Sequence, residues 1–407
     1  MESFRQLSLD AAVSINSYDS TFLIVETGAL YTCGYNGYGQ LGLGDSQDRS
    51  TLTRVPLEES AKTVVTAYNS TFVLTISGTL YACGDNRNGQ LGLGVDQGRS
   101  TLTKVTLEER VKTVVIGNSS TYVLTRSGAL YTCGFNGYGQ LGLGDRQDRS
   151  ILQRVPLEES AKMVVTGGNS TFVITRSGAL YACGENGYGQ LGLGDSQKRS
   201  VLTRIKMVET AMTITANNDF VSVLTAGGAL YTCGYNNYGQ LGLGDIQNRS
   251  TLTRVPLEEG VKMVAVGNGF LFVVTIGGAL YSCGSNFSGQ LGLGDGSNRL
   301  TLTRVPLEES AKTVVTGSGS TYVLTRSGAL YACGNNSLGQ LGLGDYFAKS
   351  TLTRVPVDER VKTVVIIDDS AFVLTRSGAL YTCGYNYYGQ LGLRDEEEKL
   401  VFTAVAN

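Results

Sequence analysis

The stretch GYNGYGQLGLGD, residues 34–45, decides how the rest of the chain is interpreted. Its residues 37–42 match G-x-G-x-x-G, the pattern of a dinucleotide-binding turn. Such a turn must open a helix whose N-terminus holds the pyrophosphate, and no helical period follows this one. The first glycine is also replaced in the equivalent stretches by Arg87, Asn237, Phe287, Ser337 and Tyr387. We therefore interpret the stretch as a structural corner and not as a phosphate loop.

The same stretch recurs every fifty residues. The pattern N-x-x-G-Q-L-G-L occurs at 36–43, 86–93, 136–143, 186–193, 236–243, 286–293, 336–343 and 386–393, with no insertion or deletion between copies. Each repeat also contains four short segments of β-type sequence, which in the second repeat are 62–65, 70–75, 79–83 and 101–107. Four antiparallel strands repeated every 40–50 residues are typical of a propeller blade.

We predict an all-β protein: a β-propeller of four-stranded antiparallel blades, with one blade for each of the eight repeats. Residues 13–407 are expected to form this single propeller, and residues 1–12 an N-terminal strand or tail. The five prolines, at 56, 156, 256, 306 and 356, follow the last segment of a repeat. Because proline cannot donate to a strand ladder, that segment is expected to be the outer edge of its blade or to end at the proline.

Residues 114–145, VVIGNSSTYVLTRSGALYTCGFNGYGQLGLGD, resemble the repeat of the regulator of chromosome condensation family, and the likeness extends over residues 13–403. The resemblance implies a propeller, for which seven blades is the family norm. It also implies, as one possible activity, guanine-nucleotide exchange on a small Ran-type GTPase. In the nuclear founding member that activity uses a protruding β-wedge and a basic tail. The uniform spacing here leaves no room for the wedge, and residues 1–10 contain a single arginine.

The composition argues against several classes of function, namely nucleic-acid binding, membrane insertion and catalysis. The chain has 407 residues, a net charge of −2 and no basic run longer than two residues, so we expect no nucleic-acid partner. No apolar run approaches the length of a membrane span, and no signal peptide is evident, so an intracellular protein of the cytoplasm or nucleus is expected. Histidine is absent. We find no catalytic, metal-binding or cofactor-binding constellation, and we expect a monomer that is not an enzyme.

The repeated polar and small residues are assigned to the scaffold. In the first repeat, Asn36 and Gln40 are expected to hydrogen-bond loop backbone, and Gly39 and Gly42 to allow left-handed turns and close approach of blades. One cysteine per repeat is expected to act as a small buried apolar residue, too far from its neighbours for a disulfide. These cysteines are Cys33, Cys83, Cys133, Cys183, Cys233, Cys283, Cys333 and Cys383.

Two recurring charged features are also interpreted as structural. Paired glutamates such as Glu58 and Glu59 follow a strand, and we expect both to be solvated in a turn. An arginine such as Arg49 follows an acidic residue by four positions in most repeats, which predicts an ion pair that braces the loop.

The positions that differ among the repeats are the candidates for recognition. Aromatic and apolar residues collect in repeats seven, eight and one, at Tyr35, Tyr38, Leu338, Tyr346, Phe347, Tyr385, Tyr387 and Tyr388. If the ring closes, repeats eight and one are neighbours, and the five tyrosines of these two repeats lie on one arc, with the residues of repeat seven beside them. Exposed tyrosine-rich patches favour protein contacts. The alternative is that these rings only pack on adjacent loops. We expect a scaffold that binds a protein partner; the alternative function is the exchange factor.

The mode of ring closure stays open at the level of sequence. Residues 4–9, FRQLSL, could add a strand to the last blade and lock the ring. Alternatively, residues 400–406, LVFTAVA, could complete the eighth repeat unaided.

Overall fold

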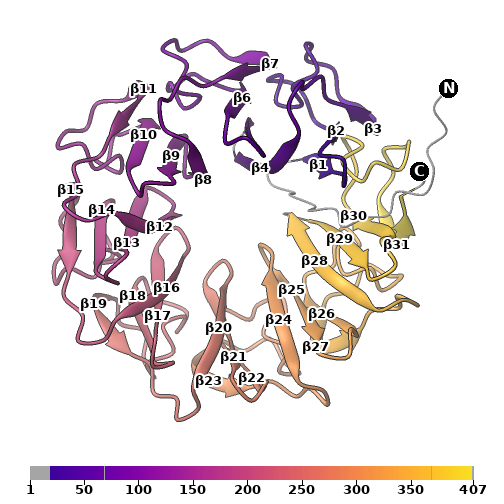
Figure 1. Cartoon of the computed structure of the whole chain (residues 1–407). Coiled ribbons are helices and arrows are strands. Elements are labelled where there is room, and N and C mark those ends of the chain that lie inside the picture. Colours follow the sequence, from indigo (N-terminus) through magenta and orange to yellow (C-terminus); the bar gives the residue numbers. More distant parts are fainter. Residues whose placement is uncertain (1–18, 68, 368, 406–407) are drawn as a thin grey trace.

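The computed structural model describes residues 19–67, 69–367 and 369–405. Throughout these residues the chain is all-β, as predicted, and it contains no helix. The strands form eight antiparallel sheets, the blades, which stand around a common axis in a closed ring (Figure 1). Blades 2 to 8 have four strands each, and blade 1 has three strands within the described residues. The predicted eight-bladed propeller is therefore confirmed.

Each blade is an up-and-down meander whose strand order in space follows the sequence. The innermost strands border the axis and are β4 (Ala61–Ala67), β8 (Val111–Ile116), β12 (Ala161–Gly167), β16 (Ala211–Ala216), β20 (Val261–Val266), β24 (Ala311–Thr316) and β28 (Val361–Ile367). The second strands are β1 (Ser20–Ile24), β5 (Ser70–Thr75), β9 (Ser120–Thr125), β13 (Ser170–Thr175), β17 (Phe220–Thr225), β21 (Phe270–Thr275), β25 (Ser320–Thr325) and β29 (Ser370–Thr375).

The outer half of each blade follows the same order. The third strands are β2 (Leu30–Gly34), β6 (Leu80–Gly84), β10 (Leu130–Gly134), β14 (Leu180–Gly184), β18 (Leu230–Gly234), β22 (Leu280–Gly284), β26 (Leu330–Gly334) and β30 (Leu380–Gly384). The outermost strands are β3 (Arg49–Arg54), β7 (Arg99–Lys104), β11 (Arg149–Arg154), β15 (Arg199–Ile205), β19 (Arg249–Arg254), β23 (Arg299–Arg304), β27 (Lys349–Arg354) and β31 (Lys399–Ala404). All five prolines lie just beyond the last residue of an outermost strand, which agrees with an edge position.

The antiparallel order gives the ring two distinct faces. Turns after the first and third strands of every blade lie on one face, which we call the long-loop face because it carries loops such as residues 35–48. Hairpins between the second and third strands, such as residues 76–79, and the connections between blades lie on the other face, the hairpin face. In the hairpin of blade 2, Gly78 has a φ of +96°, a left-handed conformation that favours glycine.

The hydrophobic core lies between blades. Between blades 2 and 3, for example, Phe72 and Leu91 of one blade pack with Val111, Val114 and Val123 of the next. Because each blade buries both of its faces against neighbours, β5 and β9 are buried along their whole length and do not alternate. The stability of a blade therefore depends on the two blades beside it.

The ring closes by the same contacts that join its other blades. In the internal joints, the amide that follows the repeated pattern donates to the outermost strand of the next blade, as Gly44 does to the carbonyl of Ser100 at 2.8 Å. At the last joint, the amide of Arg394 donates to the carbonyl of Ser50 at 2.9 Å, and Leu374 packs with Leu23 and Val25. The strand β31 completes blade 8 from its own repeat. Residues 4–9, the other predicted closure, lie outside the described residues.

Candidate partner-binding surface

The repeated loop is held by its own amide side chains. The backbone amide of Leu41 donates to Oδ1 of Asn36 at 2.9 Å, and Nδ2 of Asn36 donates to the carbonyl of Asp45 at 3.0 Å. The amide of Tyr38 donates to Oε1 of Gln40 at 2.9 Å. The bond from leucine to asparagine recurs in all eight repeats. The loop is therefore a rigid mount for whatever side chains stand at its variable positions.

Glycine sets how closely neighbouring blades approach. Gly39 has a φ of +78°, and a Cβ built on it would lie 2.5 Å from the Cα of Ser100 in the next blade. Gly42 has a φ of +73° and faces the sulfur of Cys83. The thiol of Cys83 in turn lies 3.4 Å from the carbonyl of Gln40. All eight cysteines are buried and free of disulfides, and each thiol lies near the carbonyl of a loop glutamine on the preceding blade.

Five tyrosines form one continuous cluster across the joint between blades 8 and 1. The ring centroids of Tyr35 and Tyr388 are 4.9 Å apart, and those of Tyr387 and Tyr388 are 5.0 Å apart in an edge-to-face arrangement. Tyr38 extends the cluster from Tyr35 at 6.3 Å, and Tyr385 joins it from Tyr388 at 6.4 Å. We call these five residues the seam tyrosines. The sequence placed them on one arc, and the structure brings them into mutual contact.

The seam tyrosines differ in exposure. Tyr387 is 65% exposed and Tyr38 is 38% exposed, whereas the other three are half-buried. Burial raises the pKa of Tyr35 and of Tyr385, and the nearby Asp19 raises that of Tyr385 further. Their hydroxyls therefore remain protonated donors at neutral pH. The cluster therefore combines the exposed ring of Tyr387 with the hydroxyl groups of its half-buried neighbours. Aromatic residues of this kind are frequent anchors of protein interfaces.

A cavity of about 360 Å³ lies beside this cluster on the long-loop face. Tyr385 and Leu338 line it together with Asp19, Asp369 and Phe372, so that blades 7, 8 and 1 all contribute. The lining thus holds two carboxyl groups, with serine, threonine and glutamine side chains as well as apolar ones. Nε2 of Gln340 donates to Asp369 at 2.8 Å and Nε2 of Gln390 donates to Asp19 at 3.1 Å, which holds each carboxyl in place. No local pattern in the sequence indicates this cavity, because its lining comes from three repeats.

The remaining predicted residues do not all join the cluster. Leu338 is half-buried and lines the cavity. Tyr346 and Phe347 are 51% and 73% exposed, and they lie further along the loop of blade 7. The aromatic contact of Phe347 is with the ammonium of Lys349, 5.8 Å from its ring centre. The structure therefore joins six of the eight predicted residues into one surface and leaves Tyr346 and Phe347 apart from it.

Sequence reasoning missed a second aromatic run on the same face. Ring centroids of Tyr188 and Tyr235 are 4.9 Å apart, those of Tyr235 and Tyr238 are 6.1 Å apart, and those of Tyr238 and Phe287 are 5.8 Å apart. This run crosses blades 4, 5 and 6, and Phe287 is 71% exposed. An alignment of the eight repeats at this loop would have indicated the run, because each of its aromatic residues occupies the same loop position as one of the seam tyrosines.

Charged residues border the seam tyrosines. The guanidinium carbon of Arg87 lies 5.2 Å from the ring centre of Tyr38. The predicted loop ion pairs are present, for example between Arg49 and Asp45 at 2.6 Å, and blade 2 lacks one because Val95 replaces the acid. In blade 8, Glu396, Glu397 and Glu398 are exposed on the loop that carries Tyr385.

The expectation that both glutamates of each pair are simply solvated is wrong for the second one. Glu58 is exposed, but Glu59 is half-buried and accepts hydrogen bonds from Thr75 and Tyr81, each at 3.0 Å, and from Ser77. These hydrogen bonds, the one from Ser77 above all, lower the pKa of Glu59. The pattern repeats in later blades and pins the connection between blades to the next blade. Only the fold brings these distant partners together.

The described part of the chain holds no group of three or more Cys, Asp or Glu side chains that could ligate a metal ion. It also holds no helix with the length and apolar character needed to cross a membrane.

The blades are copies of one sequence motif, and each is joined to the next through an N-x-x-G-Q-L-G loop. This motif defines the class of β-propeller. The chain belongs to the RCC1 repeat family. The model of the RCC1-like domain matches residues 153–406, and that of the regulator of chromosome condensation (RCC1) repeat matches residues 27–74, 77–124 and 127–174. A second model of this repeat matches residues 63–90 and 111–140. No curated protein sequence matches the chain significantly.

Solved structures share the fold at low identity. Human WBSCR16 has a TM-score of 0.68 at 20% identity, covering 86% of this chain and 100% of that one. Yeast RCC1 (Prp20), solved bound to Kap60, has a TM-score of 0.65 at 18% identity, covering 82% of this chain and 85% of that one. Prp20p from Saccharomyces cerevisiae, described with its binding to Gsp1p and histones, has a TM-score of 0.65 at 19% identity, covering 86% of this chain and 90% of that one.

Proposed function

We propose that the chain is a non-enzymatic platform that binds a protein partner through the seam tyrosines, Leu338 and the adjoining cavity. The observation that carries this proposal is the unbroken contact of five tyrosine rings across the joint of blades 8 and 1. Large aromatic side chains on a rigid mount lose little entropy on binding and are the usual anchors of protein interfaces. The buried thiols are typical of a reducing compartment, and we propose that the chain works inside the cell as a monomer.

The cavity suggests which partner chemistry fits. Asp19 and Asp369 lie on its lining, and the exposed acidic residues 396–398 lie on the same loop as Tyr385. A lysine or arginine side chain entering the cavity would meet both carboxyl groups and the face of Tyr385. The partner would therefore present a basic side chain next to an apolar or aromatic residue that packs on Tyr387.

The test compares two matched triple variants. Tyr385, Tyr387 and Tyr388 are replaced by Ala in one, and Tyr188, Tyr238 and Phe287 in the other, after thermal unfolding has shown that both fold. A photo-crosslinking amino acid at Tyr387 identifies the partner in the native cell, and the purified partner is then titrated against each variant. The seam variant should lose at least tenfold in affinity, and the other variant should bind normally. Undiminished binding by the seam variant, or loss only in the second variant, would contradict the proposal.

Guanine-nucleotide exchange is the second candidate function. It is supported by membership of the RCC1 repeat family and by the shared fold with Prp20p, which binds Gsp1p. All 31 strands of the described residues belong to the eight blades, and none forms an additional wedge outside them. Release of a fluorescent GDP analogue from Ran-type and Ras-like GTPases measures this activity. Acceleration that the seam variant abolishes would assign exchange to the same surface, and no acceleration with any GTPase would reject it.

A further inference from the structure

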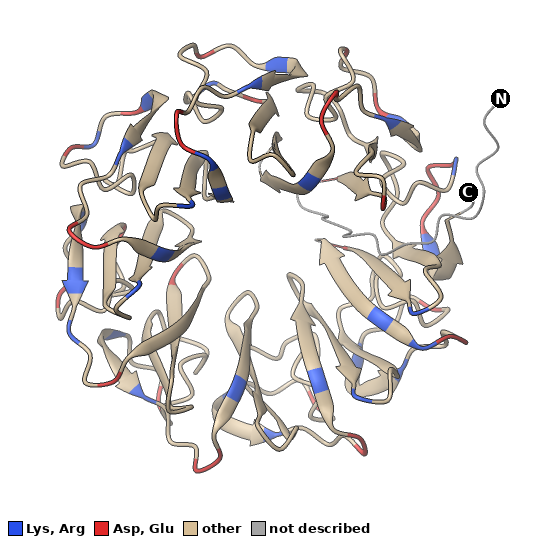
Figure 2. Cartoon of the chain, viewed as in Figure 1, with Lys and Arg blue, Asp and Glu red and all other residues tan. Residues whose placement is uncertain are grey.

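A half-buried carboxyl group lies at the joint between blades 4 and 5 on the long-loop face. It belongs to Asp219, in the turn before β17. Basic and acidic segments are interspersed all around the ring (Figure 2), yet among the described residues no ion pair forms at Asp219. Burial raises the pKa of this carboxyl, and the nearby charge of Glu185 raises it further. A cation beside Asp219 would therefore be attracted.

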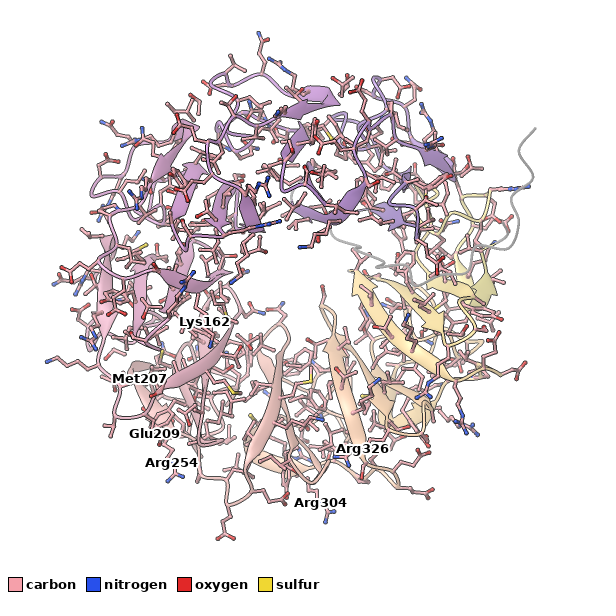
Figure 3. All side chains as sticks on the ribbon, in the orientation of Figure 1. Lys162, Met207, Glu209, Arg254, Arg304 and Arg326 are labelled. Atoms are coloured by element: carbon pink, nitrogen blue, oxygen red, sulfur yellow. The ribbon has the colours of Figure 1, made fainter. Side chains whose placement is uncertain are left out.

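A carboxyl group on the opposite face of blade 5 shows which stabilisation Asp219 lacks. Glu209 accepts hydrogen bonds from Thr225 at 2.7 Å and from Tyr231 at 2.9 Å. These hydrogen bonds, and Arg254 beside it (Figure 3), lower the pKa of Glu209. In the described part of the chain no group donates to the carboxylate of Asp219, so its oxygens can accept donors from a ligand.

The seam provides a second comparison. Nε2 of Gln390 donates to Asp19 there, and Gln190 stands at the same place relative to Asp219. Gln190 is buried, and its Nε2 has no hydrogen-bond partner within the described residues. The amide and the carboxyl group that bind each other at the seam are therefore both left unbonded at this joint.

The joint between blades 1 and 2 shows which group completes such an arrangement. Arg87 donates two hydrogen bonds to the carboxylate of Asp85, both at 3.0 Å. Its guanidinium carbon lies 5.2 Å from the ring centre of Tyr38, which belongs to the preceding blade. One cation thus binds a carboxylate and a tyrosine ring at the same time.

The joint between blades 3 and 4 reaches the same result from another loop position. Nζ of Lys198 lies 3.0 Å from a carboxylate oxygen of Glu185 and 4.3 Å from the ring centre of Tyr138. Here too the carboxylate belongs to the blade that supplies the cation, and the tyrosine belongs to the preceding blade. The arrangement is therefore a recurring element of this ring.

Blade 5 retains the tyrosine and the carboxylate but not the cation. Tyr188 of the preceding blade is 43% exposed, and its ring centre lies 4.9 Å from that of Tyr235. Asp219 lies close enough to Tyr235 to raise the pKa of that tyrosine, although burial is the larger cause. At the two loop positions that supply the cation in the other joints, blade 5 has Asn237 and Asn248. Among the described residues, no cation lies over the ring of Tyr188 or Tyr235.

The chemistry of this joint favours a guanidinium over other cations. The carboxylate of Asp219 needs hydrogen-bond donors, and a quaternary ammonium ion has none. A guanidinium holds its donors in one plane, so it can bond a carboxylate and stack on an aromatic ring at once, as that of Arg87 does. The ammonium of lysine is a more strongly hydrated point charge.

We propose that Asp219 and Tyr188 form a binding site for an arginine side chain of another protein. The guanidinium donates to the carboxylate of Asp219 and stacks on the exposed ring of Tyr188. The aromatic run continues through Tyr238 to Phe287, so an apolar or aromatic residue next to the arginine packs there. None of these residues belongs to the surface proposed above for the partner, so the inference does not depend on the proposed function.

The test uses three blocked peptides, Gly-Ser-Phe-X-Gly-Ser, in which X is arginine, its neutral analogue citrulline, or lysine. Fluorescence anisotropy of the labelled peptides measures their binding to the full chain. The arginine peptide should bind at least tenfold more tightly than the citrulline peptide, and more tightly than the lysine peptide. D219N should reduce the preference for arginine over citrulline to less than twofold. E258Q, the same change of charge on the hairpin face, should leave that preference intact.

Three further variants locate the site, after thermal unfolding has shown that each is folded. Y188A should weaken binding of the arginine peptide severalfold, and the triple seam variant described above should bind it normally. N237R places a guanidinium of the chain itself at the loop position of Arg87 and should reduce binding by competition. The proposal is overturned if the citrulline or lysine peptide binds as tightly as the arginine peptide, if D219N keeps the preference, or if the seam variant loses as much affinity as Y188A.

Discussion

Thr21 donates a hydrogen bond from Oγ1 to the backbone carbonyl of Gln390 across 2.6 Å, and this contact joins the first described blade to the last. The same contact joins Thr71 to Gln40 at 2.8 Å within the ring. The joint that closes the ring thus shares this hydrogen bond with the internal joint between blades 1 and 2. Among the described residues, blade 8 contains no strand from the N-terminal end of the chain.

Replacing this threonine should cost the same at both joints. T21V and T71V each remove one buried hydrogen bond, and the glutamine carbonyl then keeps only its weaker contact with a cysteine thiol. Each variant should lower the free energy of unfolding by about 1 kcal/mol. Urea unfolding of both variants measures the cost. A T21V loss several times larger than that of T71V would show that closure depends on that one contact.

Two glycines in one loop should respond very differently to alanine. Gly189 has a φ of +79°, and a Cβ there would lie 2.5 Å from the Cα of Ser250, so G189A should cost well over the roughly 1–2 kcal/mol of a left-handed alanine alone. Gly187 is exposed with an ordinary φ and has only the carboxyl of Glu185 nearby, so G187A should change stability little. Equal effects in urea unfolding would contradict the structural role assigned to the second glycine of the G-x-G-x-x-G pattern.

Stability should fall in acid. Hydrogen bonds lower the pKa of the second glutamate of each pair, and hydrogen bonds from loop backbone and from the basic partner lower that of the loop aspartates. Because the folded pKa lies below the unfolded value, the contribution is complete above that unfolded value, about 4. It is lost as pH falls through the folded pKa. The urea midpoint should therefore decrease from pH 5 to pH 3, and a constant midpoint would refute the assignment.

A pair of variants separates the two glutamates. E109Q weakens the hydrogen bonds that Ser127 and Tyr131 donate to the carboxylate, and it should lower the urea midpoint at pH 7. E108Q changes an exposed neighbour for which the structure records no hydrogen bond, and it should leave the midpoint unchanged. The same loss in both variants would point to net charge and not to these bonds.

The eight thiols should be inert in the folded protein. Burial raises the pKa of Cys33 to about 12 and raises that of every other cysteine as well. Thiolate is the reactive form, so a chromogenic disulfide reagent at pH 8 should react with none of them before unfolding and with eight in denaturant. Rapid reaction of even one thiol in the native state would be inconsistent with the packing between blades.

Blade 2 offers a stabilising substitution. Val95, which is 40% exposed, stands where other repeats have an acid that pairs with the residue four positions later. V95D should create an ion pair with Arg99 and raise stability by less than about 1 kcal/mol. D145V, which breaks the pair with Arg149, is the reciprocal variant and should lower it. A loss of stability in V95D, seen in urea unfolding, would contradict this reasoning.

The strands were predictable because each has a local pattern. The β-branched run 62–65 and the segment 70–75 lie within β4 and β5, and Gly78, just before the next segment, marks the turn. The seam tyrosines were predictable as neighbours only because fifty-residue periodicity implies that Tyr388 and Tyr35 flank the same joint.

What the sequence could not provide depends on contacts between distant positions. Glu59 receives its hydrogen bonds from Ser77 and Tyr81, which lie 18 and 22 residues away. The cavity needs Asp19 and Asp369 from opposite ends of the chain, and no local pattern marks either as part of a site.

One uninterrupted stretch of chain, residues 61–104, supplies the whole of blade 2 from β4 to β7. Recombination within the gene that deleted or duplicated one period would therefore remove or add a complete wedge, and every surviving joint would keep its bonding partners. The number of repeats can therefore change only as far as the shape of the blades still allows them to close into a ring.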